Sequence, residues 1–368
     1  MQLVEHDPQQ PYLWYQYMRE KHPLWYDEEK STWHVFRYAD VQTVLMNPKR
    51  FSSAIAIPAG VPRIITLTDD PAHRVLRSRI AQAFTPRRIE SLAPRITEHV
   101  NELLLPHLST GRMDLVTEFA DPLPVFVIAE LLGVPGSDRH LFRSWSSDVG
   151  SAEPLATPTK GLGVHEYFRQ VIRERQKHPH NDLITALCDQ SLSEEEILGF
   201  CQVILIAGIE TIKYALGNIM RCVKEFPEIW LRLRAQPTLI PSAIEEALRY
   251  YSPQSCFSRV IVENTELHGE QLQAGTPMTI WFASANRDER QFADADRFAI
   301  ERNPNPHLAF GQGIHFCLGA PLARLTARIV LNTFVQQINE WTWIEPGKMA
   351  TGIVYGPLNM ATEFVPAS

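Results

Sequence analysis

Cys317 is the residue of this sequence whose surroundings best suit metal or redox chemistry. It lies in FGQGIHFCLGA, residues 310–320, where Gly311, Gly313 and Gly319 give the backbone unusual freedom. A helical pattern follows at once, so amide groups at the helix start can donate to the sulfur, and the helix dipole favours an anion there. We therefore expect a thiolate at Cys317. The alternative is a buried thiol that serves only as a small hydrophobic side chain.

Other chemistries fit this stretch less well. A dinucleotide fingerprint needs glycine where Phe316 stands, and no Lys-Ser or Lys-Thr of a phosphate-binding loop follows. A nucleophilic pair of Cys317 with His315 stays open, because two residues on an unknown backbone fix no geometry. The remaining cysteines lack the spacing of a zinc or iron–sulfur site, which suits a reducing compartment. They are Cys188, Cys201, Cys222 and Cys256.

Composition sets the broad class of protein. The 368 residues are 45% hydrophobic and carry 35 basic against 42 acidic side chains, which excludes a disordered chain or a fibrous rod. No basic block indicates a nucleic-acid binder. The N-terminus shows no signal peptide or anchor, and the longest apolar stretch, 197–209, is too short for a membrane span of about 20 residues. We expect a cytoplasmic monomer that binds neither nucleic acid nor a membrane.

The elements that must position the cysteine are mostly helices. No repeat or long linker divides the chain, so we expect one domain over residues 1–368. Thr85 opens a helical pattern that Pro94 should kink or split. Residues 32–38 and 278–283 are predicted strands. The sequence therefore predicts a mainly α fold with a minor antiparallel β-sheet.

One predicted helix is long and apolar. Ser193 and Glu196 form a capping-box signature, and the helical pattern continues to Phe226, a length of about 50 Å. Its middle, 203–209, is apolar on every face, so we expect it at the centre of the molecule. The segment 146–163, rich in Ser, Gly, Pro and Thr, is either an exposed connection or a mobile lid.

The cysteine stretch FGQGIHFCLG resembles the haem-binding loop of the cytochrome P-450 superfamily, of the soluble bacterial and archaeal type. The resemblance implies a helix-rich triangular prism around a buried haem b. It makes Cys317 the axial ligand of the iron, where a thiolate favours O–O cleavage. It also implies that Phe310, Gly311 and Gly319 line the cofactor. ASANRDERQF and ERNPNPHLAFGQGIH are similar to compact thermophilic members.

A pair of charged residues supports this resemblance. Glu246 and Arg249 in AIEEALRYYSP resemble the family's structural Glu-x-x-Arg pair, and their spacing places both on one helical face. In the family a downstream arginine completes the network, and both Arg297 and Arg302 are candidates. Taken alone, such a pair is more often a surface ion pair.

Four basic residues match the family's partners of the haem propionates. His73 and Arg77 in DDPAHRVLRSR stand at these positions, and Arg259 and His315 resemble the remaining partners. Buried carboxylates need charge-assisted donors of this kind. Each residue alone fits a solvated charge, whereas the four together form a coherent set.

The stretch AGIET, residues 207–211, resembles the family's oxygen-activation segment. By this resemblance Ala207 contacts the cofactor, Thr211 hydrogen-bonds the bound oxygen, and Glu210 relays protons through water. A glycine followed by a back-bonding threonine also opens the helix ladder locally. The alternative is that Glu210, with Lys213, marks where the helix emerges into solvent.

The resemblance places the substrate against this helix, opposite the cysteine. The loop 53–65 and the segment 254–258 should close the cavity with apolar side chains, which suits a lipophilic organic substrate. The predicted lining residues are Ile55, Ile57, Ile64, Ile206, Ala207, Thr211 and Phe257.

The predicted function is that of a haem-thiolate monooxygenase that inserts one atom of O2 into a lipophilic substrate. Nothing in the chain resembles a flavin or iron–sulfur domain, so a separate ferredoxin or flavodoxin, with its reductase, should supply electrons. Arg324 and Arg328 are candidates for the basic patch that meets it. The alternatives are a haem-thiolate peroxygenase, isomerase or dehydratase, or a non-enzymatic sensor. Glu210 and Thr211 favour oxygenation.

Overall fold

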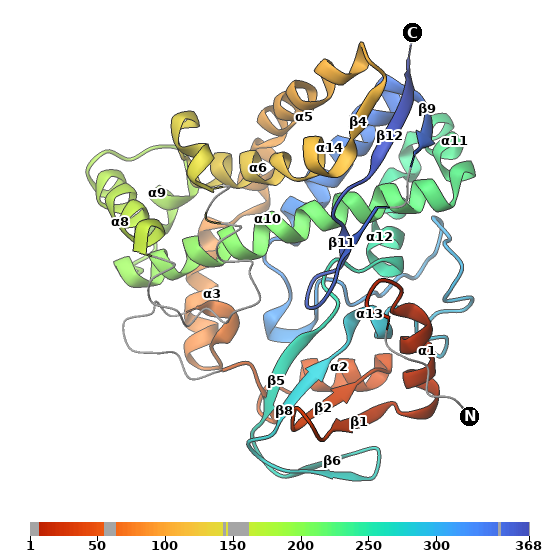
Figure 1. Ribbon diagram of the computed structural model, residues 1–368. Helices are drawn as coiled ribbons and strands as arrows, with labels where there is room; N and C mark the ends of the chain where they lie inside the picture. Colours follow the sequence, from red (N-terminus) through yellow and green to blue (C-terminus); the bar gives the residue numbers. More distant parts are fainter. Residues whose placement is uncertain (1–6, 55–63, 143–144, 146–161, 345–346, 368) are drawn as a thin grey trace.

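Helices form most of the fold in the computed structural model, which describes residues 7–54, 64–142, 145, 162–344 and 347–367 (Figure 1). The helices are α1 Tyr12–Lys21, α2 Tyr38–Met46, α3 Ala72–Ala83, α4 Pro86–Ser91, α5 Ala93–Leu108, α6 Pro122–Leu132, α8 Leu162–Lys177, α9 Leu183–Cys188, α10 Glu194–Glu225, α11 Pro227–Ala235, α12 Ile240–Tyr250, α13 Phe282–Ala285 and α14 Ala320–Gln337. The strands are β1 Leu24–Asp27, β2 Thr32–Val35, β3 Phe51–Ser52, β4 Arg112–Asp114, β5 Phe257–Ile261, β6 Thr265–Leu267, β7 Glu270–Leu272, β8 Pro277–Ile280, β9 Ile338–Trp343, β10 Met349–Ala350, β11 Gly356–Pro357 and β12 Ala361–Pro366.

Helix α10 crosses the molecule, as predicted (Figure 1). The capping box is present: the backbone amide of Glu196 donates to Ser193 Oγ at 3.2 Å, and the amide of Ser193 donates to Glu196 Oε2 at 2.8 Å. The helix ends at Glu225 because Pro227 follows. By length and composition α10 could cross a membrane, but most of its apolar window is buried against other helices, as in the core helix of a soluble protein.

The helices α6 and α14 pack beside α10, α5 packs against both of them, and together these helices complete the main hydrophobic core. Thr85 caps α4, since its side chain accepts from the amide of Arg88 at 3.3 Å. The predicted break occurs at Leu92, two residues before Pro94, which stands in the first turn of α5. Helix α14 packs against α5, and the N-terminus of α14 faces the centre of the molecule.

The main sheet has the order β1-β2-β8-β5-β3 and lies at the opposite end of the molecule from α5 and α14 (Figure 1). It is not wholly antiparallel as predicted, because β2 and β8 pair in parallel, Trp33 to Met278 through Val35 to Ile280. Both predicted strands are also shorter than expected. Residue Tyr38 begins α2, its amide donating to Asp288 Oδ2 at 2.8 Å, and Phe282 begins α13. Near the C-terminus, β12 pairs antiparallel with both β9 and β4.

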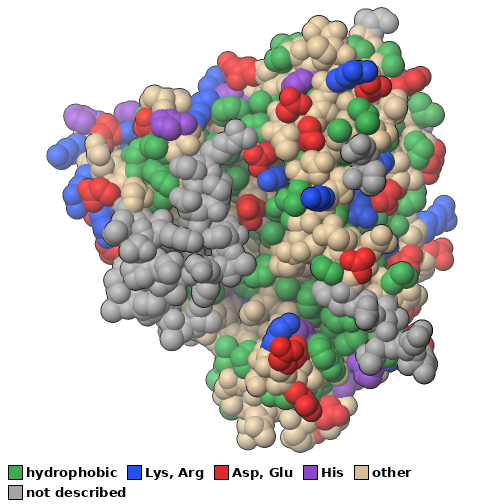
Figure 2. All heavy atoms as spheres, in the orientation of Figure 1, with side chains coloured by type: hydrophobic (Ala, Val, Ile, Leu, Met, Phe, Trp, Pro, Cys, Tyr) green, Lys and Arg blue, Asp and Glu red, His purple; other side chains and the backbone are tan. Residues whose placement is uncertain are grey.

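The charged side chains are dispersed over the surface. Figure 2 shows acidic and basic groups interspersed on the visible face, with no continuous basic field. This distribution agrees with the absence of basic blocks in the sequence. Most of the predicted connection 146–163 and the predicted pocket residues Ile55 and Ile57 lie outside the described residues.

Candidate active site

The cysteine loop is held by backbone hydrogen bonds that its glycines make possible. The amide of Cys317 donates to the carbonyl of Phe310 at 2.9 Å, which closes the loop across its base. Gly311 and Gly313 have φ of +67° and +73°, the left-handed region that glycine adopts without strain. At Gly313 a Cβ would also lie 2.7 Å from the carbonyl oxygen of Leu45, so only glycine lets the loop approach α2.

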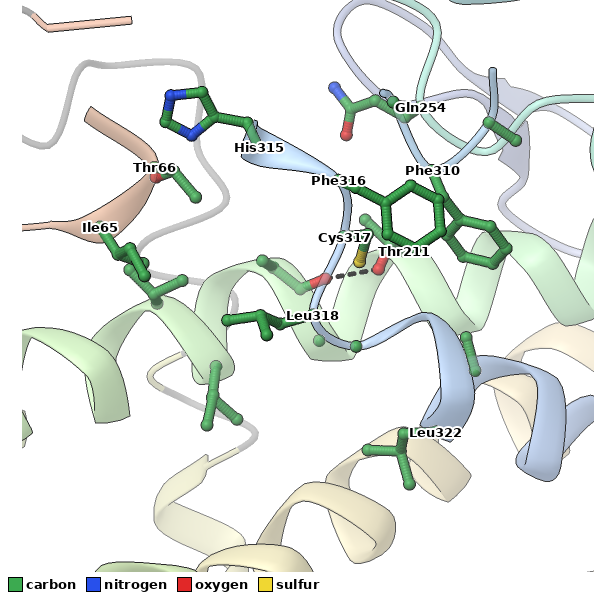
Figure 3. A pocket seen from close by; sticks show the side chains of 18 of the residues that line it. Ile65, Thr66, Thr211, Gln254, Phe310, His315, Phe316, Cys317, Leu318 and Leu322 are labelled. Atoms are coloured by element: carbon green, nitrogen blue, oxygen red, sulfur yellow. Dashed lines mark hydrogen bonds between the residues drawn. The ribbon is translucent and has the colours of Figure 1, made fainter. Parts of the chain in front are cut away.

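The loop presents Cys317 to a cavity (Figure 3). The sulfur is exposed to this cavity although the loop is packed on its other side. Burial raises the pKa of the Cys317 thiol, while the amides of Gly319 and Ala320 and the nearby guanidiniums of Arg77 and Arg324 lower it. The amides at the helix start thus favour the thiolate, as expected, while burial opposes it. A metal cation bound at the sulfur would favour the thiolate further, because it displaces the thiol proton.

Helix α10 forms the wall opposite the cysteine. Ala207 and Thr211 line the cavity, and the Thr211 hydroxyl donates to the carbonyl of Ala207 (Figure 3). Gly208 lets α6 approach, because a Cβ there would lie 2.7 Å from Ile128 Cδ1. Contrary to the prediction, Ile206 does not line the cavity: it lies on another face of α10 than Ala207 and Thr211.

Glu210 also lies off the cavity-lining face of α10. Its side chain is half-buried, and burial raises the pKa of its carboxyl group while the ammonium of Lys213 opposes the rise. Lys213 itself pairs with Asp121 at 2.7 Å. The alternative that the helix emerges into solvent at Glu210 is wrong, because α10 remains buried from Tyr214 to Val223 on its inner faces.

Four basic side chains meet at one edge of the cavity: His73, Arg77, Arg259 and His315. The rings of His73 and His315 lie 4.2 Å apart between centroids. Nε2 of His73 and Nε2 of His315 are buried and have no hydrogen-bond partner among the described residues, while Nδ1 of His73 lies 3.7 Å from the carboxylate of Asp70. Such orphaned polar atoms indicate a missing partner.

The charges around this edge would suit an anion as the missing partner. Burial, with the nearby His73 and Arg259, lowers the pKa of His315 to about 4, and burial lowers the pKa of Arg259 to about 10. Burial and Arg77 lower the pKa of His73. A carboxylate at this edge would reverse these shifts by favouring the charged forms. Arg77 already donates from Nη2 to the carbonyl of Phe316 at 2.5 Å, which ties α3 to the cysteine loop.

The pair Glu246 and Arg249 is fully buried and bidentate. Arg249 Nε and Nη2 each donate to a different oxygen of Glu246 at 2.8 Å. Arg302 completes the network, its Nε lying 3.2 Å from both oxygens of Glu246. Arg297 contributes only its backbone carbonyl, which accepts from Arg249 at 3.1 Å. The surface ion pair considered above is thus excluded.

The neighbouring carboxylate, Glu245, joins both ends of the cysteine loop. Arg324 on α14 donates to it from Nε and Nη2 at 2.7 Å, and His307 Nε2 before the loop lies at 3.0 Å. Although burial opposes it, these hydrogen bonds lower the pKa of Glu245 to about 2. Arg328 pairs with Glu90 at 2.8 Å. Both candidates for the basic patch thus pair with carboxylates, and their contact with a redox partner stays a prediction.

The remaining walls are apolar. Phe257, Phe310, Gly311 and Gly319 line the cavity, whereas Ile64 is buried elsewhere and Ile65 and Thr66 stand in its place. Sequence reasoning missed many apolar lining residues outside the motifs. They include Leu45, Phe84, Ile128, Leu131, Phe200, Val203, Ile204, Phe282 and Leu322. Their helical periodicity shows that they are inside the protein, but not which of them face a cavity.

Comparison with known proteins decides the identity of this site. The model of the cytochrome P-450 family matches residues 163–342. The chain is 37% identical to a putative cytochrome P-450, YjiB, of Bacillus subtilis over 95% of this chain and 93% of that protein. It is 38% identical to the erythromycin C-12 hydroxylase of Saccharopolyspora erythraea, covering 89% and 87%. The chain belongs to the cytochrome P-450 family.

A solved structure of this family gives the same fold. The crystal structure of CYP109E1 from Bacillus megaterium in complex with testosterone superposes with a TM-score of 0.89 at 36% identity, covering 96% of this chain and 99% of that one. The predicted fold class is confirmed. The chain is accordingly a cytochrome P-450 monooxygenase with a haem-thiolate cofactor, as the hydroxylases and epoxidases among its relatives are.

The residues of this cytochrome P-450 fit haem. Cys317 supplies the sulfur on one side of the cavity, and the apolar side of α10 faces it. The orphaned nitrogens of His73 and His315 lie at the edge beside Arg77 and Arg259, where two propionates need donors. A flat, apolar macrocycle with two carboxylates at one edge matches this distribution of groups.

Proposed function

We propose that this cytochrome P-450 takes a lipophilic organic substrate, with electrons supplied by a separate ferredoxin or flavodoxin in the cytoplasm. The observation that carries the proposal is the apolar cavity between Cys317 and α10, with the Thr211 hydroxyl as a polar group on the wall opposite the sulfur. Relatives point to the same ligand chemistry: one hydroxylates erythromycin and another binds testosterone.

Each part of the site has a role in this proposal. Haem, when bound, supplies the redox centre at which O2 is activated. Cys317 holds it from one side, and His73, Arg77, Arg259 and His315 hold its carboxylates. The apolar walls bind the substrate and exclude water.

Thr211 is the proposed proton donor at the reacting face. Its hydroxyl donates to the carbonyl of Ala207, and breaking that bond frees the same hydrogen for an oxygen in the cavity. Glu210, one residue earlier on α10, is the proposed carrier of protons from outside the cavity to Thr211. Burial raises the pKa of its carboxyl group, which favours the protonated form that can pass on a proton.

Isotope labelling tests the proposal. With a ferredoxin, its reductase, NADH and labelled O2, we expect one labelled oxygen atom in the product of a lipophilic substrate. Product formed from hydrogen peroxide alone, without electron donor, would instead establish a peroxygenase. Ligand binding without conversion under both conditions would favour a sensor.

A further inference from the structure

Few polar side chains line the cavity, and most of them already have a role. The four basic residues serve the cofactor edge, Cys317 faces the iron position, and Thr211 bonds to its own helix. The remaining polar side chains among the described lining residues are Thr66 and Gln254. A hydroxyl such as that of Thr66 both donates and accepts, so it imposes no direction on a ligand. The amide of Gln254, by contrast, does impose a direction on a ligand.

The side-chain amide of Gln254 is held in place by hydrogen bonds from its nitrogen. Its Nε2 donates to the carbonyl of Cys256 at 2.7 Å and to that of Ile353 at 3.2 Å. Reversing the amide would set Oε1 against two carbonyl oxygens, so these contacts settle which atom points where. The backbone beside Gln254 is also anchored. The backbone amide of Ser255 donates to the carbonyl of Ile353 at 2.8 Å, and Ser255 is almost wholly buried.

The carbonyl oxygen of Gln254 is therefore a fixed acceptor at the cavity. Figure 3 shows the amide with its oxygen turned toward the other lining side chains and its nitrogen turned away. In the part of the chain that the structure describes, no group donates to this oxygen. The neighbouring wall is apolar, with Pro253, Phe257 and Phe282.

We infer that Gln254 Oε1 accepts a hydrogen bond from a hydroxyl or N–H group of the substrate. The site thus selects a lipophilic molecule that carries a donor at this end over an analogue that carries only an acceptor. An apolar ligand without a donor covers the oxygen and leaves it unpaired, and such mismatches are what binding sites reject most strongly. This inference rests on the proposed function, because it assumes that the cavity binds a lipophilic substrate.

Matched ligand pairs test the inference in the haem-loaded ferric protein. Testosterone carries a hydroxyl where androstenedione carries a ketone, and a medium-chain alcohol differs from its methyl ether in the same way. Dissociation constants come from the change in haem absorption on binding, without electrons or turnover. We expect the wild type to bind the alcohols roughly 3- to 10-fold more tightly than their partners. In Gln254→Leu and Gln254→Met this ratio should fall to about 1, chiefly through weaker binding of the alcohols.

A matched control is Thr66→Val, which removes the hydroxyl of the other polar lining residue without an assigned role and should keep the ratio. An unchanged CO-bound spectrum in each variant shows that the cofactor site is intact. A ratio near 1 in the wild type, an unchanged ratio in both Gln254 variants, loss of the ratio in Thr66→Val, or no binding of any probe overturns the inference. A different outcome is that the wild type prefers the alcohols but forms no product when electrons and O2 are supplied. That outcome would support the role of Gln254 and overturn the proposed function instead.

Discussion

The two sides of the cavity are built differently. On the cysteine side, directional bonds fix the chain: the backbone bond from Cys317 to Phe310, the double link of Glu245 to Arg324 and His307, and the buried Glu246 network. On the side of α10, the lining consists of apolar side chains, and Thr211 bonds only within its own helix. On the side proposed to hold the cofactor, hydrogen bonds and ion pairs therefore fix the positions of the side chains. On the side proposed to take the substrate, the lining fixes only the shape and the apolar character of the cavity.

The largest effect should come from the sulfur. Cys317→Ala removes the proposed ligand of the haem iron, and we expect complete loss of both monooxygenase activity and the red-shifted absorption band of the reduced, CO-bound protein. Haem content measured beside the spectrum separates loss of the ligand from loss of the cofactor. Retention of the red-shifted band in this variant would mean that another side chain binds the iron.

The second largest effect should come from the buried network of Glu246, Arg249 and Arg302. Glu246→Gln leaves the buried guanidinium of Arg249 without its carboxylate, so we expect the free energy of unfolding of the haem-loaded protein to fall by about 3–5 kcal/mol. Denaturant unfolding measures this loss.

A pair of arginine variants is the matched control. Arg302→Ala should destabilise the protein clearly, because its guanidinium contacts both oxygens of Glu246. Arg297→Ala should be nearly neutral, because only its backbone takes part. Equal losses in the two variants would contradict the assignment of Arg302.

A smaller effect is expected from Thr211, on the side of the cavity that takes the substrate. In Thr211→Ala we expect haem and substrate to bind as in the wild type, while the yield of product per electron falls about tenfold and hydrogen peroxide accumulates. Thr211→Ser, which keeps the hydroxyl, should restore most of the coupling. Unchanged coupling in the alanine variant would remove Thr211 from the proposed proton path.

The smallest expected effect is the pH dependence of the Glu245 link. Its folded pKa of about 2 lies below the unfolded value of about 4.3, so the carboxylate stabilises the fold above the unfolded pKa. This contribution is lost as the pH falls from roughly 5 through 2. The difference in unfolding free energy between wild type and Glu245→Gln should therefore shrink between pH 6 and pH 3. A difference that stays constant over this range would show that Glu245 does not act through its charge.

The contrast between the two sides also explains what the sequence could predict. The cysteine loop is encoded locally, because its glycines, its sulfur and the start of α14 lie within about a dozen residues. The capping box of α10 and the break before Pro94 are local for the same reason. These features could be predicted because each depends on close neighbours in the chain.

Long-range features could not be predicted in this way. The choice between Arg297 and Arg302 depends on how a loop returns to α12, and the roles of Arg324 and Arg328 depend on the distant carboxylates Glu245 and Glu90. Ile206 is apolar like its neighbours, so composition does not tell which face of α10 it occupies. The thiol pKa of Cys317 depends on burial by the whole fold.

The parallel pairing of β2 with β8 has a consequence for how the protein is made. Residues 33–35 find their partner strand only at 278–280, so the sheet cannot be completed until most of the chain has left the ribosome. Until then the hairpin of β1 and β2 has an unpaired edge, which is prone to association with other chains. The growing polypeptide must therefore keep that edge shielded during translation.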